Sequence, residues 1–424
     1  MMWNQGEGII LRKLNPSRLF RSALALTSAF SLCIFLTGCL SPIAMHRAVI
    51  EYDRTVHRVE AELLLLNIAR ARHYRPVHFT AVSSVAATFD FRVKAGVLGR
   101  ISRGSVSDDS LVDLNYGTEV AENPTVTIVP VSGEEFTKRI LRPLDESHLN
   151  FLVRQGFDLS MVLRLLGRGI LIDGGEEAPV ILFNTPSRRE EYTEFRRRLL
   201  HLAALDFQKR LHIAAIIYEE AFPVSLEKGL TPAEVVAAID RGYRWSVSTD
   251  DRPAILIRQV TGRLAITNYD LKRLGNDERK RLNVEIERLP PDHVFVDIRP
   301  GFPGGEYPLK GFILLRSFNS IISFVARGIA EDAGYHVEPD PRTGPVQRNP
   351  AHVLEIEESS SPLKDAEFDA EFEGKYYSIR KFPISEGMVP SWNQEAFAVL
   401  ANLFQMTVTD VSNVRTPIIS IPKG

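Results

Sequence analysis

The chain of 424 residues has little cysteine and no excess of either charge. Its two cysteines cannot build a disulfide scaffold or a cysteine-rich zinc module. Lys and Arg number 51 against 53 Asp and Glu, so nothing in the overall charge favours binding to nucleic acid. Because 44% of the residues are hydrophobic and 25% are charged, the composition also excludes a disordered chain and a polytopic membrane protein.

The sequence also lacks the short motifs that carry common enzyme chemistry. Its ten histidines are scattered and form no His-Glu-x-x-His pair, so we predict no metal site. It has no glycine loop followed by Lys-Ser/Thr for a phosphate group, and no Gly-x-Ser-x-Gly turn for a nucleophile. We therefore predict no cofactor and name no catalytic residue, which favours a role other than catalysis without excluding an enzyme.

The first 40 residues have the pattern of a secretory targeting segment. A basic region with four Lys and Arg precedes an apolar run over residues 22–36, which ends in Leu-Thr-Gly-Cys at positions 36–39. A basic start, an apolar stretch of this length and small residues at its end are typical of a signal peptide. The alternative is an uncleaved anchor or an ordinary signal, since the run is almost long enough to span a bilayer.

The sequence at positions 36–39 resembles the lipobox of bacterial lipoproteins. The resemblance implies that the Cys39 thiolate takes a diacylglyceryl group, that cleavage falls between Gly38 and Cys39, and that the new amine is acylated. Residues 1–38 would then be a signal peptide and 39–54 a lipidated tether, with the membrane reached through the lipid on Cys39. Leu40 after the cysteine favours, by the same resemblance, the outer membrane of a Gram-negative host, with the protein facing the periplasm.

Periodicity predicts a helix over residues 55–73, followed by a strand. Apolar residues recur at helical spacing from Val56 to Ala69, and Pro76 ends the helix. Alternating apolar and charged residues at positions 89–94 then predict a half-buried strand. We expect residues 96–123 to be mainly loop and 126–131 to be a second strand.

Later in the chain, capping signals and apolar spacing mark several helices. Ser132 to Glu135 and Thr231 to Glu234 each resemble a capping box at a helix start. Apolar residues at i, i+3, i+4, i+7 and i+11 from Phe318 predict an amphipathic helix. In the tail we expect a strand over 376–382, a helix beginning after Ser391, and a final strand over 417–421.

These patterns predict an α+β protein with mixed helices and short, mainly antiparallel strands, without internal repeats. We divide it into an N-terminal α+β region (55–225), a central α+β region (226–337), a Pro-rich and acidic linker (338–365) and a strand-helix-strand segment (366–424). The linker is expected to be exposed, because proline and acidic residues dominate it.

Two basic clusters are the remaining candidates for a binding role. Residues 196–198 are three consecutive arginines, which we expect to pair with nearby glutamates on a solvated helix face. Arg70, Arg72 and Arg75 have no acidic residues between them and follow an apolar helix close to the proposed anchor. They are candidates to contact anionic lipid or an acidic partner, or they complement the helix dipole and pair with carboxylates elsewhere in the chain.

One stretch resembles an uncharacterised family of proteobacterial lipoproteins. It comprises the Leu-rich, Asn-containing and Arg-punctuated residues 63–76 and the segment 77–85 with its Val-Ser-Ser motif. Residues 129–136 and parts of the tail at 376–377, 397–405 and 417–421 are similar as well, whereas the loop 384–390 departs from the family. The resemblance implies an envelope lipoprotein with a periplasmic α+β body and supplies no catalytic residue.

Two functions from different classes follow as hypotheses. The first is a lipid-anchored envelope lipoprotein that binds or scaffolds other envelope components, with a protein partner that the sequence does not identify. The alternative is a periplasmic hydrolase that acts on lipid or cell-wall material through a site that the sequence does not reveal. A passive spacer is the third possibility.

Overall fold

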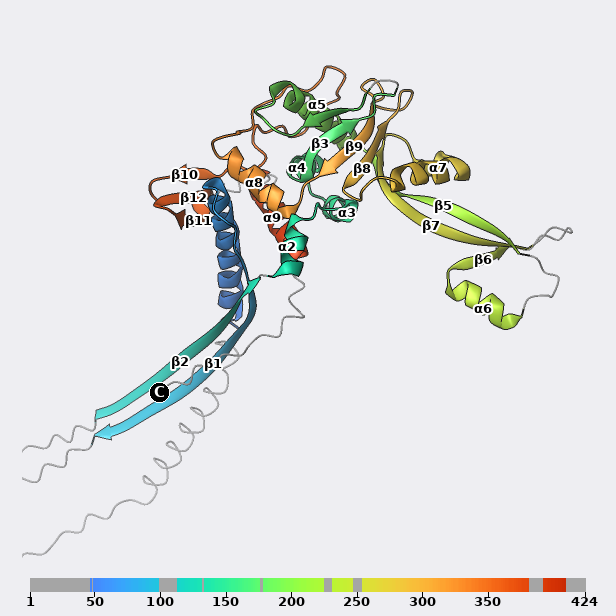
Figure 1. Cartoon of the computed structure of the whole chain (residues 1–424). Helices are drawn as coiled ribbons and strands as arrows, with labels where there is room; N and C mark the ends of the chain where they lie inside the picture. The colour runs from blue at the N-terminus through green and yellow to red at the C-terminus, as the bar shows by residue number, and fades with distance from the viewer. Residues whose placement is uncertain are drawn as a thin grey trace, which may run out of the picture. The chain divides into compact units, whose positions relative to one another are not determined.

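A computed structural model describes residues 46–47, 49–98, 113–131, 133–175, 178–224, 231–246, 254–380 and 392–408, with the backbone alone over 81–98 and 113–131. The proposed lipidation segment, Ser132, Ser391 and the predicted strand at 417–421 lie outside these residues. The chain divides into two compact units, Met1–Val59 and Glu60–Gly424. The predicted α+β class is confirmed (Figure 1).

The N-terminal helix comprises residues 46–47 and 49–72 and so begins well before residue 55. The described part of the predicted tether at 39–54 is therefore helical, because no proline or glycine interrupts residues 44–75. In the second unit this helix buries Leu64, Leu65, Ile68 and Ala69. It ends before Pro76, as predicted.

The other helices follow the predicted pattern closely. α4 is buried along its whole length, and the capping box of α6 forms as predicted from Thr231 and Glu234. The helix for which Ser132 was the predicted N-cap, α2, begins one residue later than expected. Its N-cap residue is Gly133, and no side chain caps it. The helices are α2 (Glu134–Leu141), α3 (Glu146–Arg154), α4 (Leu159–Leu166), α5 (Arg189–Phe207), α6 (Pro232–Asp240), α7 (Asn276–Glu287), α8 (Phe318–Gly328) and α9 (Trp392–Val408), with a 3-10 turn η1 (Leu271–Arg273).

Over the residues that the structure describes, the strands form three sheets, and β1 and β2 are longer than the sequence indicates. The strands are β1 (Phe79–Leu98), β2 (Asp113–Val131), β3 (Gly167–Ile172), β4 (Val180–Phe183), β5 (His212–Val224), β6 (Tyr243–Ser246), β7 (Ala254–Thr267), β8 (His293–Ile298), β9 (Leu309–Leu315), β10 (Glu357–Ser359), β11 (Ala366–Phe372) and β12 (Lys375–Arg380). β1 and β2 pair with each other as a two-stranded ribbon. The expected loop at 96–123 is therefore wrong from residue 113 onward, because pairing with β1 holds polar residues of low strand propensity in β2.

The central sheet has seven strands in the order β4-β3-β9-β8-β7-β5, with β6 also pairing with β7. All its pairs are antiparallel except β7 with β8. Successive residues of β8 enter different cores: Val294 and Val296 join the larger cluster, whereas Phe295 joins a smaller one with Leu282 and Ile286 of α7. The sheet is therefore covered on both faces, which explains why β8 is apolar almost throughout.

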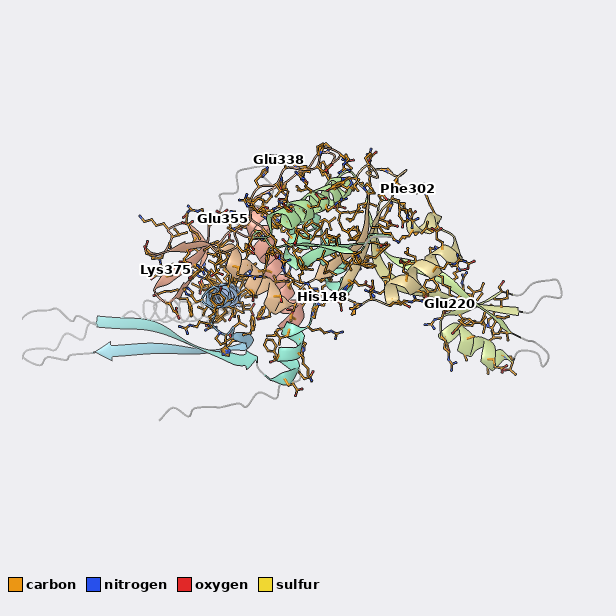
Figure 2. The ribbon with its side chains drawn as sticks, turned by 45° about the horizontal axis from the view of Figure 1, so that its top comes forward. His148, Glu220, Phe302, Glu338, Glu355 and Lys375 are labelled. Carbon is orange, nitrogen blue, oxygen red and sulfur yellow. The ribbon has the colours of Figure 1, made fainter. Side chains whose placement is uncertain are left out.

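The segment 338–365 is packed against the body and is not an exposed linker. Val353, Leu354 and Ile356 are buried in the larger core, and Asp340 is 9% exposed. The segment can be followed between the labelled residues Glu338 and Glu355 in Figure 2. Side chains from the body also hold its middle part, since Arg164 and Arg196 donate to the carbonyl oxygens of residues 350 and 351.

Arg196 is the clearest of these arginines and corrects the expectation of a solvated face. Its side chain is fully buried, and its guanidinium donates to Asn349 Oδ1 at 2.7 Å and to the carbonyl oxygens of Pro350 and Ala351. Arg198 does pair with a glutamate of its own helix, as expected. The position of Arg196 between Tyr192 and Leu199 on the buried stripe of α5 was the signal in the sequence that would have indicated burial.

Candidate functional site

The three arginines that the sequence singles out lie at and after the C-terminal end of the N-terminal helix. The helix is followed by a turn in which Tyr74 has a positive φ of 55° and the Arg75 N–H donates to the Arg70 carbonyl at 2.8 Å. Buried Asn67 supports the segment beyond the turn, because its Oδ1 accepts from the His78 N–H at 2.8 Å and from Arg70 Nη1 at 3.2 Å. This explains why an asparagine stands within an otherwise apolar helix.

Two of the arginines are paired with carboxylates of the same chain. Arg72 Nη1 lies 2.9 Å from Glu331 Oε1, and Arg75 Nη2 lies 3.0 Å from Glu373 Oε1. Although no acidic residue lies between the arginines in the sequence, both side chains therefore have carboxylate partners in the fold. The alternative that helix C-terminal arginines pair with carboxylates elsewhere is confirmed for them, because the glutamates come from residues more than 250 positions away.

Histidine and tyrosine side chains extend this polar cluster toward the small sheet. The His73 Nε2 and the Tyr377 Oη lie 2.6 Å apart, and the Tyr377 hydroxyl donates to Glu358 Oε2 at 3.2 Å. Burial, with a further contribution from the Glu358 charge, raises the pKa of Tyr377 to about 12. The hydrogen bond that Tyr74 donates to Glu331 raises the pKa of Tyr74 as well. The cluster thus connects the helix end to β10–β12 and to the segment that follows α8.

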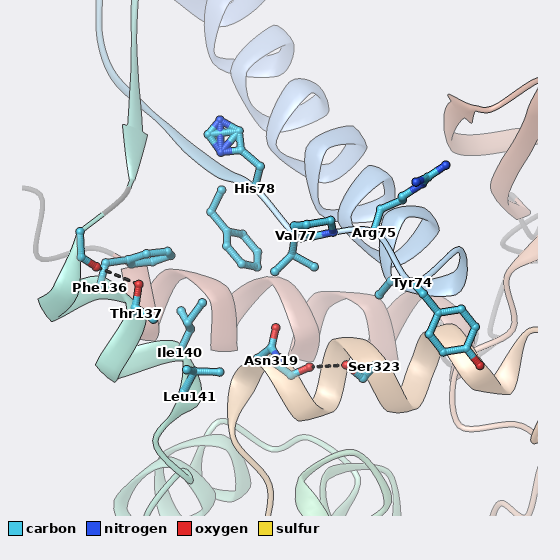
Figure 3. A pocket seen from close by; sticks show the side chains of 14 residues that line it. Tyr74, Arg75, Val77, His78, Phe136, Thr137, Ile140, Leu141, Asn319 and Ser323 are labelled. Carbon is cyan, nitrogen blue, oxygen red and sulfur yellow. Dashed lines mark hydrogen bonds between the residues drawn. The ribbon is translucent and has the colours of Figure 1, made fainter.

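An open groove lies beside this helix end and is the candidate binding site (Figure 3). Its volume is about 630 Å³, within the range of ligand sites. Its walls come from the turn after the N-terminal helix, from α2 and from α8. The apolar lining residues are Ala71, Pro76, Val77, Phe79, Phe136, Ile140 and Leu141, and the polar ones are Tyr74, Arg75, His78, Thr137, Asn319 and Ser323.

The floor of the groove is buried, whereas its rim is exposed. Phe79 is 2% exposed and stacks against Phe136, Phe318 and Phe404 with ring centroids 5.5–5.8 Å apart. Leu141 on the rim is 54% exposed. Such a groove suits an apolar segment that buries its surface against the floor and meets polar groups at the edge.

The two hydroxyl side chains that α2 and α8 contribute to the groove make no contact with a base. The Ser323 hydroxyl donates to the Asn319 carbonyl at 3.0 Å, and the Thr137 hydroxyl donates to the Gly133 carbonyl at 2.9 Å. Both hydroxyls are thus engaged within their own helices (Figure 3). Nucleophilic catalysis needs a hydroxyl or thiol within reach of a base.

A hydroxyl-imidazole contact does occur elsewhere, between Thr343 Oγ1 and His201 Nδ1 at 3.3 Å. His201 is 2% exposed, and its Nε2 donates to the Gly304 carbonyl at 2.8 Å. Burial lowers the pKa of His201, which keeps the ring neutral at pH 7. Because a substrate cannot reach a ring buried in this way, the contact holds residues 340–344 against α5.

Over the described residues, no group of three or more His, Cys, Asp or Glu side chains is placed to hold a metal ion. Among the same residues, no helix combines the length and apolar character needed to cross a bilayer. Cys39 and Gly38 lie outside them, so the proposed lipidation stays a prediction. No protein-family model, curated protein or solved structure matches the chain.

Proposed function

We propose that this chain is a lipid-anchored envelope protein whose groove binds an apolar segment of another envelope component. In this proposal Cys39 carries the lipid, and the body faces the periplasm from the outer membrane. The Leu-Thr-Gly-Cys sequence at 36–39 supports the anchor. The groove, with its buried aromatic floor and exposed apolar rim, is the observation that carries the binding role.

Binding through the groove fits the structure better than binding through the arginines. A cation that contacts anionic lipid must exchange an existing ion pair for a new one, and both Arg72 and Arg75 already have carboxylate partners. Binding in the groove breaks no ion pair. It lowers the free energy because the exposed apolar side chain of Leu141 is removed from water.

Site-specific photo-crosslinking in living cells tests the binding role. A photo-reactive residue at Leu141 on the groove rim is compared with one at Phe151, which is 47% exposed on α3 and does not line the groove. We expect a discrete crosslinked product from position 141 alone. We also expect Thr137→Lys to abolish it without changing the yield of folded protein, because Thr137 lines the groove and its side chain is exposed.

The outcomes separate the parts of the proposal. Equal products from both positions, or none from position 141, would overturn binding in the groove. The mass of the N-terminal peptide tests the anchor independently, since acylation of Cys39 adds a mass that Cys39→Ala lacks. A Glu substitution at Arg70, Arg72 and Arg75 together should leave membrane association unchanged if those arginines serve packing only.

A further inference from the structure

The β1–β2 ribbon is long, antiparallel and separate from the other sheets of the described chain (Figure 1). Its register pairs Phe79 with Val131 at one end and Leu98 with Asp113 at the other, with one irregularity between Val82 and Ser84. Because directly paired residues share a face and successive residues alternate, this register assigns every position to one of two faces.

The two faces differ in composition, since five charged residues lie on one face and a single one, Glu122, lies on the other. One face, the apolar face, carries at β1 positions 85–97 the residues Val85, Ala87, Phe89, Phe91, Val93, Ala95 and Val97. Their partners on β2 are Val126, Pro124, Glu122, Val120, Thr118, Tyr116 and Leu114. The opposite face is the polar face, and its charged residues are Asp90, Arg92, Lys94, Asp113 and Glu119.

An apolar face of this extent requires a cover. The seven β1 positions cover about 40 Å at the rise of an extended strand. A two-stranded ribbon has no second layer of its own, and it is at best marginally stable in water. The proposed anchor at Cys39 would hold the chain at a bilayer, whose acyl chains would cover such a face.

We propose that the β1–β2 ribbon lies in the membrane interface, with its apolar face against the acyl chains and its polar face toward the headgroups and water. The inference rests on the anchoring part of the proposed function and is independent of the groove. It adds a second contact with the membrane to the lipid on Cys39.

The interface suits the ribbon better than the interior of the bilayer. Each outer edge of an isolated ribbon leaves backbone N–H and C=O groups without a partner, and such groups are costly in hydrocarbon. A ribbon lying flat keeps its edges level with headgroups and water, which satisfy those groups. The polar face carries two cations and three anions, so the attachment should depend on apolar burial and change little with salt.

Cysteine scanning along β1 tests the proposal on the full chain. Single cysteines at Phe89, Phe91 and Val93 probe the apolar face, and Asp90 and Arg92 provide matched positions on the polar face. Each variant is labelled with an environment-sensitive fluorophore and reconstituted in phosphatidylethanolamine–phosphatidylglycerol vesicles. We expect emission to shift to the blue with a period of two residues. Lipids brominated near the headgroup should quench the shifted positions, and iodide in the buffer should quench the others.

Each other result overturns the inference. A blue shift without quenching by brominated lipid would mean that protein covers the apolar face, and quenching from lipids brominated at the chain end would mean that the ribbon crosses the bilayer. Equal emission at all positions would mean that neither face is covered. Failure of the anchor gives a different signature, because Cys39 would then react with the dye in the chain without an added cysteine.

Discussion

Replacing Arg316 by methionine tests how the body is held together. Arg316 directly follows β9 and is 6% exposed. Its guanidinium donates to the carbonyl oxygens of Arg164, Leu165 and Gly167 where α4 ends, and to that of Asn184. The side chain therefore satisfies carbonyls that a helix leaves without partners at its C-terminus.

The structure indicates how much this contact contributes. The Asn184 side-chain amide also donates to the carbonyls of Arg164 and Gly167, so both keep a partner in the variant. The carbonyls of Leu165 and Asn184 lose the donor that Arg316 provides. Each unsatisfied buried group costs about 1–3 kcal/mol, and release from burying a cation offsets part of this cost. We expect Arg316→Met to lower the free energy of unfolding by about 3 kcal/mol.

Urea unfolding followed by tryptophan fluorescence measures this change. The comparison requires that the free energy of unfolding falls with urea concentration at the same slope in the variant and the parent chain. Arg327→Met is the matched control, because Arg327 is an exposed residue of α8 and its loss should change stability by less than about 0.5 kcal/mol. Arg316→Lys should fall between the two, since an ammonium reaches fewer carbonyls. A midpoint for Arg316→Met equal to or above that of the parent chain would refute the reasoning, because cation burial would then outweigh the hydrogen bonds.

Three further predictions concern single contacts. Burial raises the pKa of Tyr377 to about 12 in the folded chain, against 10.0 for the free side chain, so the contribution of the protonated hydroxyl to stability is complete below pH 10 and is lost as the pH rises to about 12. The urea midpoint of the parent chain should therefore fall over this pH range, and the midpoint of Tyr377→Phe should fall less. Thr231→Ala removes the capping box of α6 and should cost about 1 kcal/mol there, so amide exchange in α6 should accelerate about fivefold while the rest of the body is unchanged. On the outer edge of β5, the Asn276 side chain donates to the Glu219 carbonyl and accepts from the Glu219 N–H. Asn276→Ala should expose that edge, and light scattering should then detect self-association. A variant that stays monomeric at all concentrations would contradict this role.

Local patterns in the sequence predicted those helices whose ends and buried face depend only on residues close together in the chain. The helix from Phe318 formed because its apolar residues return to one face every three or four positions. The α6 capping box formed because Thr231 and Glu234 satisfy each other's backbone groups without outside help. The end of the N-terminal helix before Pro76 has a similarly local cause.

The candidate site could be predicted only in part. The sequence placed Arg72 and Arg75 at the end of an apolar helix, which the structure confirms. It could not indicate that Glu331 and Glu373 pair with them, because those glutamates follow more than 250 residues later. The groove was also missed, since its walls come from three separated elements and no short motif marks their meeting.

The remaining differences arise where a distant partner decides the conformation. Residues 113–123 have weak strand propensity but form part of β2 because β1 supplies their hydrogen bonds. The segment 338–365 has the composition of a linker, but distant residues hold its middle part against the body. Val353, Leu354 and Ile356 are buried in the larger core, and two buried arginines donate to the carbonyls of residues 350 and 351. The sequence by itself determined the class and several helices, since these depend on residues that are neighbours along the chain, and the address remains a prediction from the sequence. The tertiary structure decided which charges are paired, which segments are buried and where the groove lies, because these depend on contacts between residues that only folding brings together.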